Sequence, residues 1–529
     1  MTAPSALDAR TRDEWFRRVQ ATTYDLLVIG AGITGAGIAR DAALRGLSVA
    51  LVEAGDLACG TSSRSSKMIH GGLRYLAQGD VGLVKEAARE RQVLRRVAPH
   101  LARIDQFMMP LSRSGLATMR AGLVAFERLG KVPKGERHEV LSTAELRRRE
   151  PLVDADRYAG AVAYPEFLTN DARLTLANVR SAVEAGADVL TYAPVTTIVV
   201  SGGRAVAAEC TGALPGESLS ATVRARQIVN AAGPWVDAVR ALEDDAAPPR
   251  LMLTKGVHLV VPHERLPVAH TVLTLGADKR PVFAVPSGEV TYLGTTDTRY
   301  DAADLWPGVT RADVDYLSGA MGNTFVGPRL GTEDLVTTWS GIRPLIAQEG
   351  KKPSEISRKD EVWVGPHGIR SIAGGKLTAY RAMAERIVDD VVAELGDSAR
   401  LCATKDQPLV GGDVQPSGAA EPDGGGRLYE LYGSEAAEVV ADGGDVAAEV
   451  RQAVCREGAL RLEDYWVRRG ARAWFTQQPV GGSLDAAAAE MGSLLGWDDA
   501  RRQAEVARCR GIHQRSLTFA DTVEDSPTV

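Results

Sequence analysis

Residues 25–53 carry the pattern that most constrains the fold of this chain. They read DLLVIGAGITGAGIARDAALRGLSVALVE. An apolar run at 26–29 is typical of a buried parallel strand. Small and apolar residues then recur at helical spacing over 33–44, a second strand pattern follows over 48–52, and Glu53 ends it. The stretch therefore predicts a complete strand–turn–helix–strand–acid unit of the dinucleotide-binding kind.

Gly30, Gly32 and Gly35 stand in this unit at the spacing G-x-G-x-x-G. Gly30 permits the tight turn, Gly32 leaves room for a pyrophosphate, and Gly35 lets the helix pack close to the sheet. The helix N-terminus offers free N–H groups to phosphate oxygens, and Glu53 is placed to accept hydrogen bonds from a ribose. A structural glycine turn is the alternative interpretation. The motif alone does not separate FAD from NAD.

The overall composition excludes some classes of function. The chain has 529 residues, enough for two or three domains, and a net charge of −6 gives no reason to expect nucleic acid as a partner. The five cysteines are widely scattered, and no two of them have C-x-x-C spacing, so we expect neither a metal site nor a disulfide framework. They are Cys59, Cys210, Cys402, Cys455 and Cys509.

The N-terminal residues 1–23 are polar and charged and lack the apolar core of a signal peptide. No run of residues reaches the length of a membrane span. The sequence therefore predicts a cytoplasmic protein. Peripheral contact with the inner face of the cell membrane stays open, because hydropathy does not report on it.

The strand–glycine–helix pattern returns late in the chain. A short strand at 369–372 runs into Ala373-Gly374-Gly375-Lys376, and a helix is predicted over 377–395. The nucleotide fold is thus interrupted, which suits FAD held along its full length. Between these parts, 251–339 is rich in strands and hairpin signals and predicts an antiparallel sheet.

We expect an α/β fold, in which a Rossmann-like FAD-binding domain carries an inserted antiparallel β-sheet cap domain and a C-terminal all-helical domain. The predicted boundaries run in chain order. They are 1–23 as a polar extension, 24–100, 166–240 and 340–400 as the FAD-binding domain, 101–165 and 241–339 as the substrate cap, 401–426 as a linker, 427–520 as the helical domain and 521–529 as a tail.

Several long stretches resemble the FAD-dependent glycerol-3-phosphate dehydrogenases of the aerobic, respiratory type. The resemblance spans nearly the whole chain and is weakest over 100–165. The stretches are IGAGITGAGIARDAALRG at 29–46, GTSSRSSKMIHGGLRYL at 60–76, NAAGPWVD at 230–237, TKGVHLVV at 254–261, GTTDT at 294–298, SGIRPL at 340–345, GGKLTAYRAMA at 374–384, LEDYWVRRGARAWF at 462–475 and LLGWD at 494–498.

This resemblance implies oxidation of sn-glycerol 3-phosphate to dihydroxyacetone phosphate in glycerol catabolism. A hydride leaves carbon 2 for the flavin, and the electrons pass on to a quinone-type acceptor. A homodimer is one option for the oligomeric state. The residues expected to contact the cofactor are Gly30, Gly32, Gly35, Glu53, Thr61, Ser62, Ser66, Gly72, Gly233, Gly374, Gly375, Leu377 and Thr378.

The substrate side is implied by the same motifs. Arg74, Tyr75, Arg343 and Lys376 are expected to bind the substrate, because arginine offers a bidentate fork to phosphate and lysine a point charge. For an isolated arginine the competing interpretation is a surface residue. A lysine at a helix N-terminus opposes the helix dipole, so a purely stabilising role is disfavoured for Lys376.

Three residues are candidates for the chemistry itself: His258, Arg343 and Lys376. His258 in TKGVHLVV is the first candidate for the base that accepts the hydroxyl proton, and a histidine packed in a strand is an equal alternative. Arg343 is a candidate to stabilise the developing alkoxide. His70 is expected beside the flavin rather than in catalysis.

Three other functions stay open at this point. A related flavin oxidase of an amino acid or other small acid would share the fold without needing these cations to meet a phosphate. A glycerophosphate oxidase would use oxygen as acceptor, although we see no long insertion of the kind that marks those enzymes. A non-catalytic FAD-binding platform is the least favoured.

Overall fold

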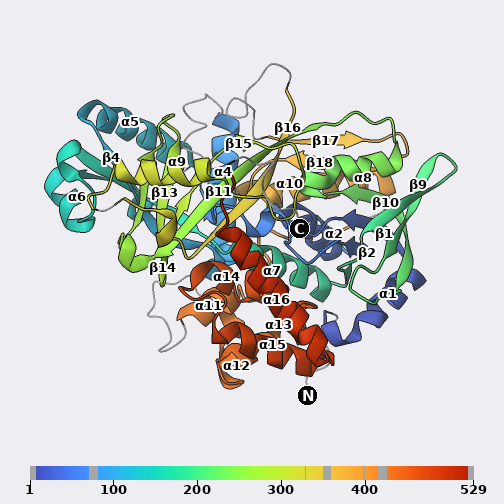
Figure 1. Ribbon diagram of the computed structural model, residues 1–529. Coiled ribbons are helices and arrows are strands. Elements are labelled where there is room, and N and C mark those ends of the chain that lie inside the picture. Colours follow the sequence, from blue (N-terminus) through green and yellow to red (C-terminus); the bar gives the residue numbers. More distant parts are fainter. Residues whose placement is uncertain are drawn as a thin grey trace.

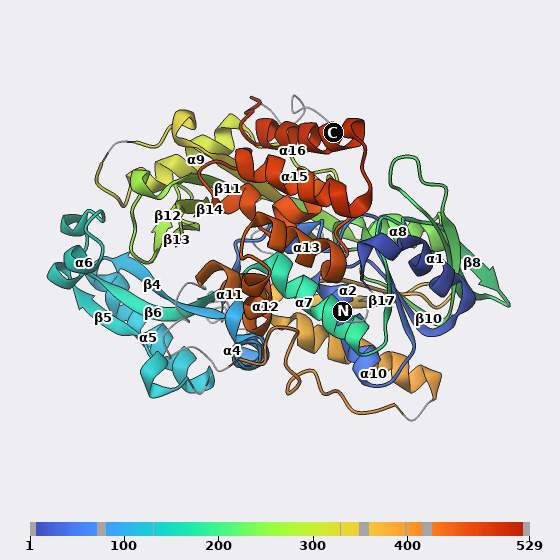
Figure 2. The same ribbon diagram turned by 90° about the horizontal axis from the view of Figure 1, so that it is seen from below.

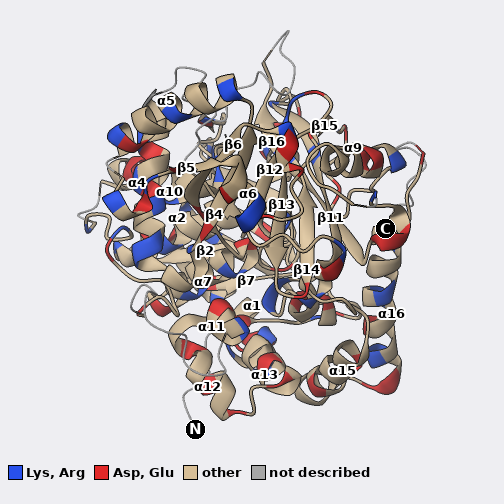
Figure 3. Cartoon of the chain, turned by 90° about the vertical axis from the view of Figure 1, so that its left-hand side faces the viewer, with Lys and Arg blue, Asp and Glu red and all other residues tan. Residues whose placement is uncertain are grey.

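Two large sheets and a C-terminal group of helices make up the chain (Figure 1). The structure is a computed structural model, and it describes residues 7–70, 81–130, 132–327, 329–348, 359–396, 399–414 and 426–521. Acidic and basic residues are interspersed along the outer helices (Figure 3). Within the described residues, no helix is both long and apolar enough to cross a membrane.

The first sheet has the order β17-β18-β10-β1-β2-β7 among the described residues, with β9 paired to β10 and β8 paired to β9. Its central strands β1, β2, β7, β10 and β18 are parallel. The strands are β1 (Thr23–Ile29), β2 (Val49–Val52), β7 (Asp188–Leu190), β8 (Val195–Ser201), β9 (Arg204–Thr211), β10 (Ser220–Asn230), β17 (Asp360–Val364) and β18 (Arg370–Gly374).

The side chains of β1 point alternately to the two faces of this sheet, and both faces are covered. Leu26 and Val28 pack with the helices α2 (Ile33–Leu44), α7 (Asp171–Glu184) and α10 (Tyr380–Leu395). Leu27 and Ile29 point the other way, into the core that includes α1 (Arg12–Ala21). The predicted α/β nucleotide-binding fold is confirmed, including the helix over 33–44.

The helix predicted over 377–395 is present, but its α-helical part begins three residues later than expected. Its first turn is a 3₁₀ turn, Leu377–Ala379, with Lys376 as the N-cap residue, and α10 starts at Tyr380. The helix α7 begins at Asp171. The Oδ1 atom of Asn170 accepts from the N–H of Arg173, so Asn170 rather than Asp171 is the N-cap.

The second sheet has the order β15-β11-β14-β13-β12-β4-β6-β3 among the described residues, with β16 beside β11 and β5 beside β6. Its pairs are antiparallel except β4 with β12. Its strands are β3 (Met68–Ile69), β4 (Arg103–Leu111), β5 (Glu139–Ser142), β6 (Gly160–Leu168), β11 (Leu251–Pro262), β12 (Thr271–Leu275), β13 (Pro281–Ser287), β14 (Val290–Gly294), β15 (Thr298–Arg299) and β16 (Thr337–Ile346).

Helices flank this second sheet, and α5 and α6 lie at its far end (Figure 2). They are α4 (Val81–Val97), α5 (Arg113–Gly130), α6 (Thr143–Arg149) and α9 (Arg311–Gly322). The helix α8 (Val236–Glu243) contacts β8, β10 and β18 of the first sheet instead. Along β11, Val257 and Leu259 pack with Leu317 of α9. The alternate residues Gly256 and His258 therefore face the opposite side, where they line a cavity.

Residues 426–516, here called the C-terminal helical region, lie beside α7 and also contact β16 of the second sheet (Figure 1). The predicted helical character of this region is confirmed. A π-helical turn, Asp464–Arg469 (η12), is buried against the nucleotide fold. The helices are α11 (Gly426–Tyr432), α12 (Ala436–Ala441), α13 (Val446–Glu457), α14 (Arg472–Phe475), α15 (Gly482–Leu495) and α16 (Asp499–Ser516).

Candidate active site

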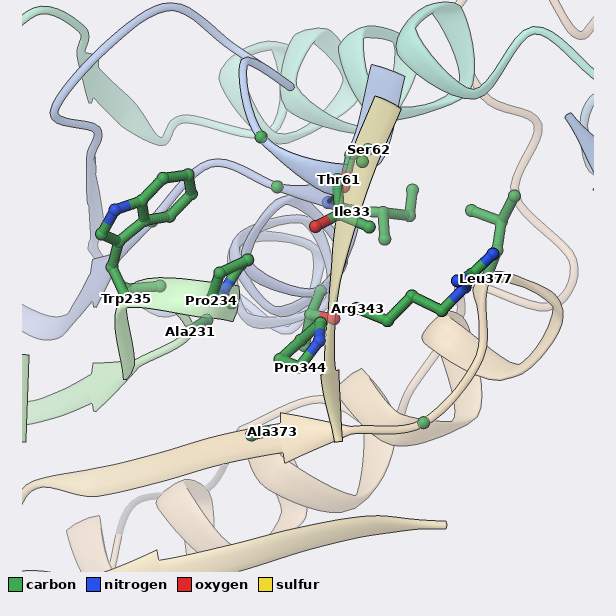
Figure 4. A pocket seen from close by; sticks show the side chains of 18 of the residues that line it. Ile33, Thr61, Ser62, Ala231, Pro234, Trp235, Arg343, Pro344, Ala373 and Leu377 are labelled. Atoms are coloured by element: carbon green, nitrogen blue, oxygen red, sulfur yellow. Dashed lines mark hydrogen bonds between the residues drawn. The ribbon is translucent and has the colours of Figure 1, made fainter. Parts of the chain in front are cut away.

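A cavity of about 490 Å³ lies between the two sheets. Figure 4 shows the parts of the chain that surround it: Ile33, Thr61 and Ser62 lie near the start of α2, and Arg343 and Pro344 lie on β16. Ala231, Pro234 and Trp235 follow β10, and Ala373 and Leu377 flank the turn before α10. The cavity thus lies at the carboxyl ends of parallel strands, where α/β sheets bind ligands.

One end of the cavity is the glycine turn between β1 and α2. Gly30 has a φ of +103°, which favours glycine, and a Cβ on Gly35 would overlap the carbonyl oxygen of Gly30. A Cβ on Gly32 would meet only Oγ of Ser62, at 3.2 Å, on the cavity side. The α2 helix has no side-chain cap and no acidic residue in its first turn. This end fits an anionic pyrophosphate.

Glu53 stands beside this turn at the end of β2. Its Oε2 accepts from the N–H of Ala31 at 2.7 Å, and its Oε1 accepts from the N–H of Gly55 at 2.9 Å. Burial raises the pKa of Glu53, although these two backbone donors oppose the effect. Burial also raises the pKa of the neighbouring Cys59 thiol, whose Sγ is 3.6 Å from Oε1 of Glu53. Cys59 was not expected here, and its raised pKa disfavours the reactive thiolate at neutral pH.

Most of the expected cofactor residues line this one cavity. Gly30, Gly32, Glu53, Thr61, Ser62, Ser66, Gly233, Gly374, Gly375, Leu377 and Thr378 all do so. Gly35 is not in the lining, because it packs α2 onto the turn. Gly72, Arg74 and Tyr75 lie outside the described residues. In the part of the chain that the structure describes, no group of three or more His, Cys, Asp or Glu side chains is arranged to hold a metal ion.

The cationic end of the cavity contains Arg343 and Lys376. Nη2 of Arg343 donates to Oγ1 of Thr295 at 2.9 Å, and Nη1 lies 3.2 Å from the carbonyl oxygen of Thr296 and 3.4 Å from Oδ1 of Asp297. Lys376 precedes α10 and lines the same cavity. With burial and Arg91, it lowers the pKa of His70 to about 3. The cavity is thus lined by two cationic side chains.

His258 lies in the wall of the cavity on β11. Its ring stacks on Trp339 with centroids 4.7 Å apart, and its Nε2 is 2.9 Å from Oγ of Ser66. Burial, followed by the charges of Arg343 and Lys67, lowers the pKa of His258 well below its ordinary value. The imidazole is therefore neutral at neutral pH. Its Nδ1 is buried without a hydrogen-bond partner among the described residues.

Two glycines that sequence reasoning passed over shape this wall. A Cβ on Gly256 would overlap the guanidinium of Arg343, and a Cβ on Gly294 would overlap the ring of His258. Both glycines lie in strands, where glycine is otherwise unfavourable and often marks a close approach. That signal was present in TKGVHLVV and GTTDT and would have identified them.

The fold and the cavity define a flavin-dependent oxidoreductase. Residues 25–381 match the family described as FAD dependent oxidoreductase, and residues 402–502 match the C-terminal domain of alpha-glycerophosphate oxidase. The chain is 37% identical over 533 residues to the aerobic glycerol-3-phosphate dehydrogenase of Staphylococcus haemolyticus, covering 94% of this chain and 95% of that protein. It is also 37% identical over 535 residues to the Staphylococcus aureus protein of the same name, covering 94% and 96%.

A solved structure matches nearly the whole chain. The glycerol-3-phosphate dehydrogenase from Bacillus halodurans, complexed with FAD, superposes with a TM-score of 0.80 at 30% identity and covers 97% of this chain and 99% of that one. L-alpha-glycerophosphate oxidase from Mycoplasma pneumoniae, with FAD bound, gives a TM-score of 0.54 at 16% identity, covers 73% and 99%, and shows the fold alone. This chain belongs to the FAD-dependent oxidoreductase family and, within it, to the aerobic glycerol-3-phosphate dehydrogenases.

Proposed function

We propose that this chain oxidises sn-glycerol 3-phosphate to dihydroxyacetone phosphate, with FAD as the redox cofactor. The proposal rests on one observation: Arg343 and Lys376 line the same cavity as the glycine turn at Gly32. A dinucleotide subsite and a cationic subsite thus share one cavity. The full-length relatives named glycerol-3-phosphate dehydrogenase support the choice of substrate.

FAD would lie along the cavity from the glycine turn to the turn before α10. Gly32 and the N-terminus of α2 would face the pyrophosphate, and Glu53 the ribose. Gly374, Gly375 and the residues after them would lie near the other end. Bound FAD supplies the hydride acceptor.

The substrate phosphate carries close to two negative charges at neutral pH and needs cations in a covered site. Arg343 is suited to it, because its guanidinium is held by Thr295, Thr296 and Asp297 before any ligand arrives. The same guanidinium can stabilise negative charge that develops on the C2 oxygen. Lys376, which lines the same cavity, adds a point charge. We propose that these two residues bind and orient the substrate together with Arg74 and Tyr75.

His258 is our candidate for the base. When the hydride leaves carbon 2, the hydroxyl proton must move to an acceptor so that a carbonyl can form. A neutral imidazole can take that proton, and His258 lines the cavity in which the substrate would lie. A dianionic substrate beside Arg343 would offset the positive charge that lowers the pKa of His258, which makes the ring a better base in the complex.

The substrate assignment is tested by comparing glycerol 3-phosphate with glycerol and with glycine at equal concentrations. Glycerol retains the reacting carbinol but lacks the phosphate. We expect turnover with glycerol 3-phosphate and a loss of at least about 100-fold in kcat/KM with glycerol, which corresponds to about 3 kcal/mol from charge-assisted contacts. Turnover of glycine instead would contradict the proposal and favour an amino-acid oxidase.

For the electron acceptor we propose a quinone, reached from peripheral contact with the inner face of the cell membrane. The aerobic dehydrogenase relatives support this proposal. The match of residues 402–502 to an alpha-glycerophosphate oxidase domain favours oxygen as the second candidate. Mixing the substrate-reduced protein with a soluble quinone or with oxygen tests the choice. Faster reoxidation by the quinone would support the dehydrogenase, and faster reoxidation by oxygen would support the oxidase.

A further inference from the structure

Asp56 connects the nucleotide-binding fold to the C-terminal helical region. It lies in the loop that follows Glu53, and its side chain is 1% exposed. Its Oδ2 accepts hydrogen bonds from Nε of Arg468 and from Nη1 of Arg469, which both belong to the π-helical turn η12. These arginines are 2% and 1% exposed. The contact therefore joins two parts of the chain that are about 400 residues apart, deep inside the protein.

The loop that carries Asp56 also holds the glycine turn. The N–H of Ala58 donates to the carbonyl oxygen of Ala31 at 3.1 Å, and the N–H of Ala31 donates to Glu53 at 2.7 Å. Glu53 in turn accepts from the N–H of Gly55. The peptide groups of Ala31, between Gly30 and Gly32, are thus fixed from both sides by residues that flank Asp56.

The turn η12 also contacts the loop indirectly, through Tyr192. The N–H of Tyr192 donates to the carbonyl oxygen of Gly55 at 2.8 Å, and its hydroxyl donates to Oδ1 of Asp464 at 2.5 Å. Asp464 is also 2.7 Å from Nη2 of Arg468. The turn η12 therefore holds the loop directly through Asp56 and indirectly through Tyr192.

Asp56 is held as a charged carboxylate by the two arginines beside it. Burial tends to raise the pKa of Asp56, but Arg469 and Arg468 outweigh it and hold the pKa below its usual value. The carboxylate is therefore ionised at neutral pH. Removing one member of such a buried group leaves an uncompensated charge, and that is far more costly than losing an exposed ion pair.

We propose that Asp56 is a positioning residue through which the C-terminal helical region holds the loop 53–60 against the glycine turn and so retains FAD. The C-terminal helical region then acts on the cofactor without contacting the reacting atoms. This inference rests on the proposed placement of FAD in the cavity and does not depend on the identity of the substrate.

The same interface offers a matched control. Glu457 is fully buried on α13, and its two oxygens accept from Nη1 and Nη2 of Arg173 at 2.7 and 2.9 Å. Arg180 lies 3.8 Å away. This is again one buried carboxylate with two arginines between the C-terminal region and the nucleotide fold. However, no member of this group lies on the loop 53–60, because Glu457 is on α13 and the two arginines are on α7.

The experiment compares FAD release from full-length Asp56→Asn and Glu457→Gln holoproteins. FAD release is followed by the rise in flavin fluorescence after dilution, and Tm is measured for both. We expect both variants to have a lower Tm. We expect Asp56→Asn to release FAD at least ten-fold faster than the unsubstituted protein, and Glu457→Gln to stay within two-fold of it. Equal release from the two variants, or normal release from Asp56→Asn, would overturn the inference.

A second variant covers the case in which Asp56→Asn does not fold. Arg469→Lys keeps the positive charge and removes the guanidinium that reaches Asp56. We expect it to release FAD about three-fold faster, and unchanged release would count against the inference. Holoprotein that keeps FAD tightly but is not bleached by glycerol 3-phosphate would contradict the proposed function and leave this inference standing.

Discussion

The guanidinium of Arg343 occupies the space in front of Gly256, where a side chain on that residue would overlap it. The two residues lie on the neighbouring strands β16 and β11, which pair Gly256 with Gly341 and Thr254 with Arg343. The absent side chain at Gly256 lets a charged group lie flat against a sheet. Thr295, Thr296 and Asp297 hold that group from the far side. Gly256 is therefore part of the cationic subsite although it carries no functional group.

Replacing Gly256 with alanine should displace Arg343 and weaken substrate binding. Loss of one charge-assisted contact is worth about 1.5–3 kcal/mol, so we expect kcat/KM for glycerol 3-phosphate to fall about 10- to 100-fold. FAD content should not change. The control is Gly319→Ala on α9, where an added Cβ meets nothing within 4 Å. Normal kinetics in Gly256→Ala would show that the position of Arg343 does not matter.

Arg343→Ala and Lys376→Ala should each leave FAD bound while turnover falls sharply. Each removes a cation from the substrate end of the cavity, and the expected loss in kcat/KM is about 100-fold or more. Arg299→Ala is the matched control, because this arginine lies on the same sheet but is largely exposed and pairs with the exposed Asp301. Steady-state kinetics and flavin absorbance decide the result. A variant with unchanged kinetics removes its residue from the site.

Gly32→Val and Gly35→Ala should fail in different ways. The cavity side of Gly32 has only Ser62 within reach, so Gly32→Val should fold but emerge colourless, because its side chain fills the pyrophosphate position. Gly35→Ala drives a Cβ into the backbone of Gly30 and should lower the yield of folded protein. Circular dichroism and flavin absorbance distinguish the two. A yellow, fully loaded Gly32→Val protein would contradict the placement of the cofactor.

The pair formed by His270 and Glu150 predicts a pH-dependent contribution to stability. Nδ1 of His270 is 2.7 Å from Oε1 of the fully buried Glu150, and this hydrogen bond raises the pKa of His270 above its ordinary 6.5. A raised pKa means that the contribution is complete below pH 6.5 and is lost as the pH rises through the folded-state pKa. His270→Gln should therefore cost about 0.5–1 kcal/mol at pH 5.5 and less at pH 9. Denaturant unfolding at both pH values measures this, and a cost that grows with pH would contradict it.

The nucleotide-binding unit could be predicted from sequence because its signals are local. The strand over 26–29, the helix over 33–44 and the glycines between them are all contained in a short stretch. The region from 103 to 168 could not be assigned in the same way. Its strand β4 is only partly buried and pairs with β6, about 50 residues later and beyond two helices. Such a register depends on tertiary packing and leaves little trace in a local pattern.

The candidate site shows the same division. Motifs identified Arg343, Lys376 and His258, and the cavity contains all three. The supporting contacts were not predicted, namely the space in front of Gly256, the Ser66 contact of His258 and the grip of Arg468 and Arg469 on Asp56. Each of these contacts joins residues that are distant in sequence. An arginine in a helical pattern is expected to be solvated, and only the fold shows that it has a buried partner.

Anaerobic mixing of the FAD-loaded protein with glycerol 3-phosphate tests the central claim most directly. The flavin absorbance is followed in the absence of any other acceptor, with glycerol as the matched compound that lacks the phosphate. We predict rapid bleaching by glycerol 3-phosphate, little change with glycerol, and dihydroxyacetone phosphate formed in an amount equal to the bleached flavin. A fully loaded yellow protein that stays yellow with glycerol 3-phosphate would contradict the proposed function.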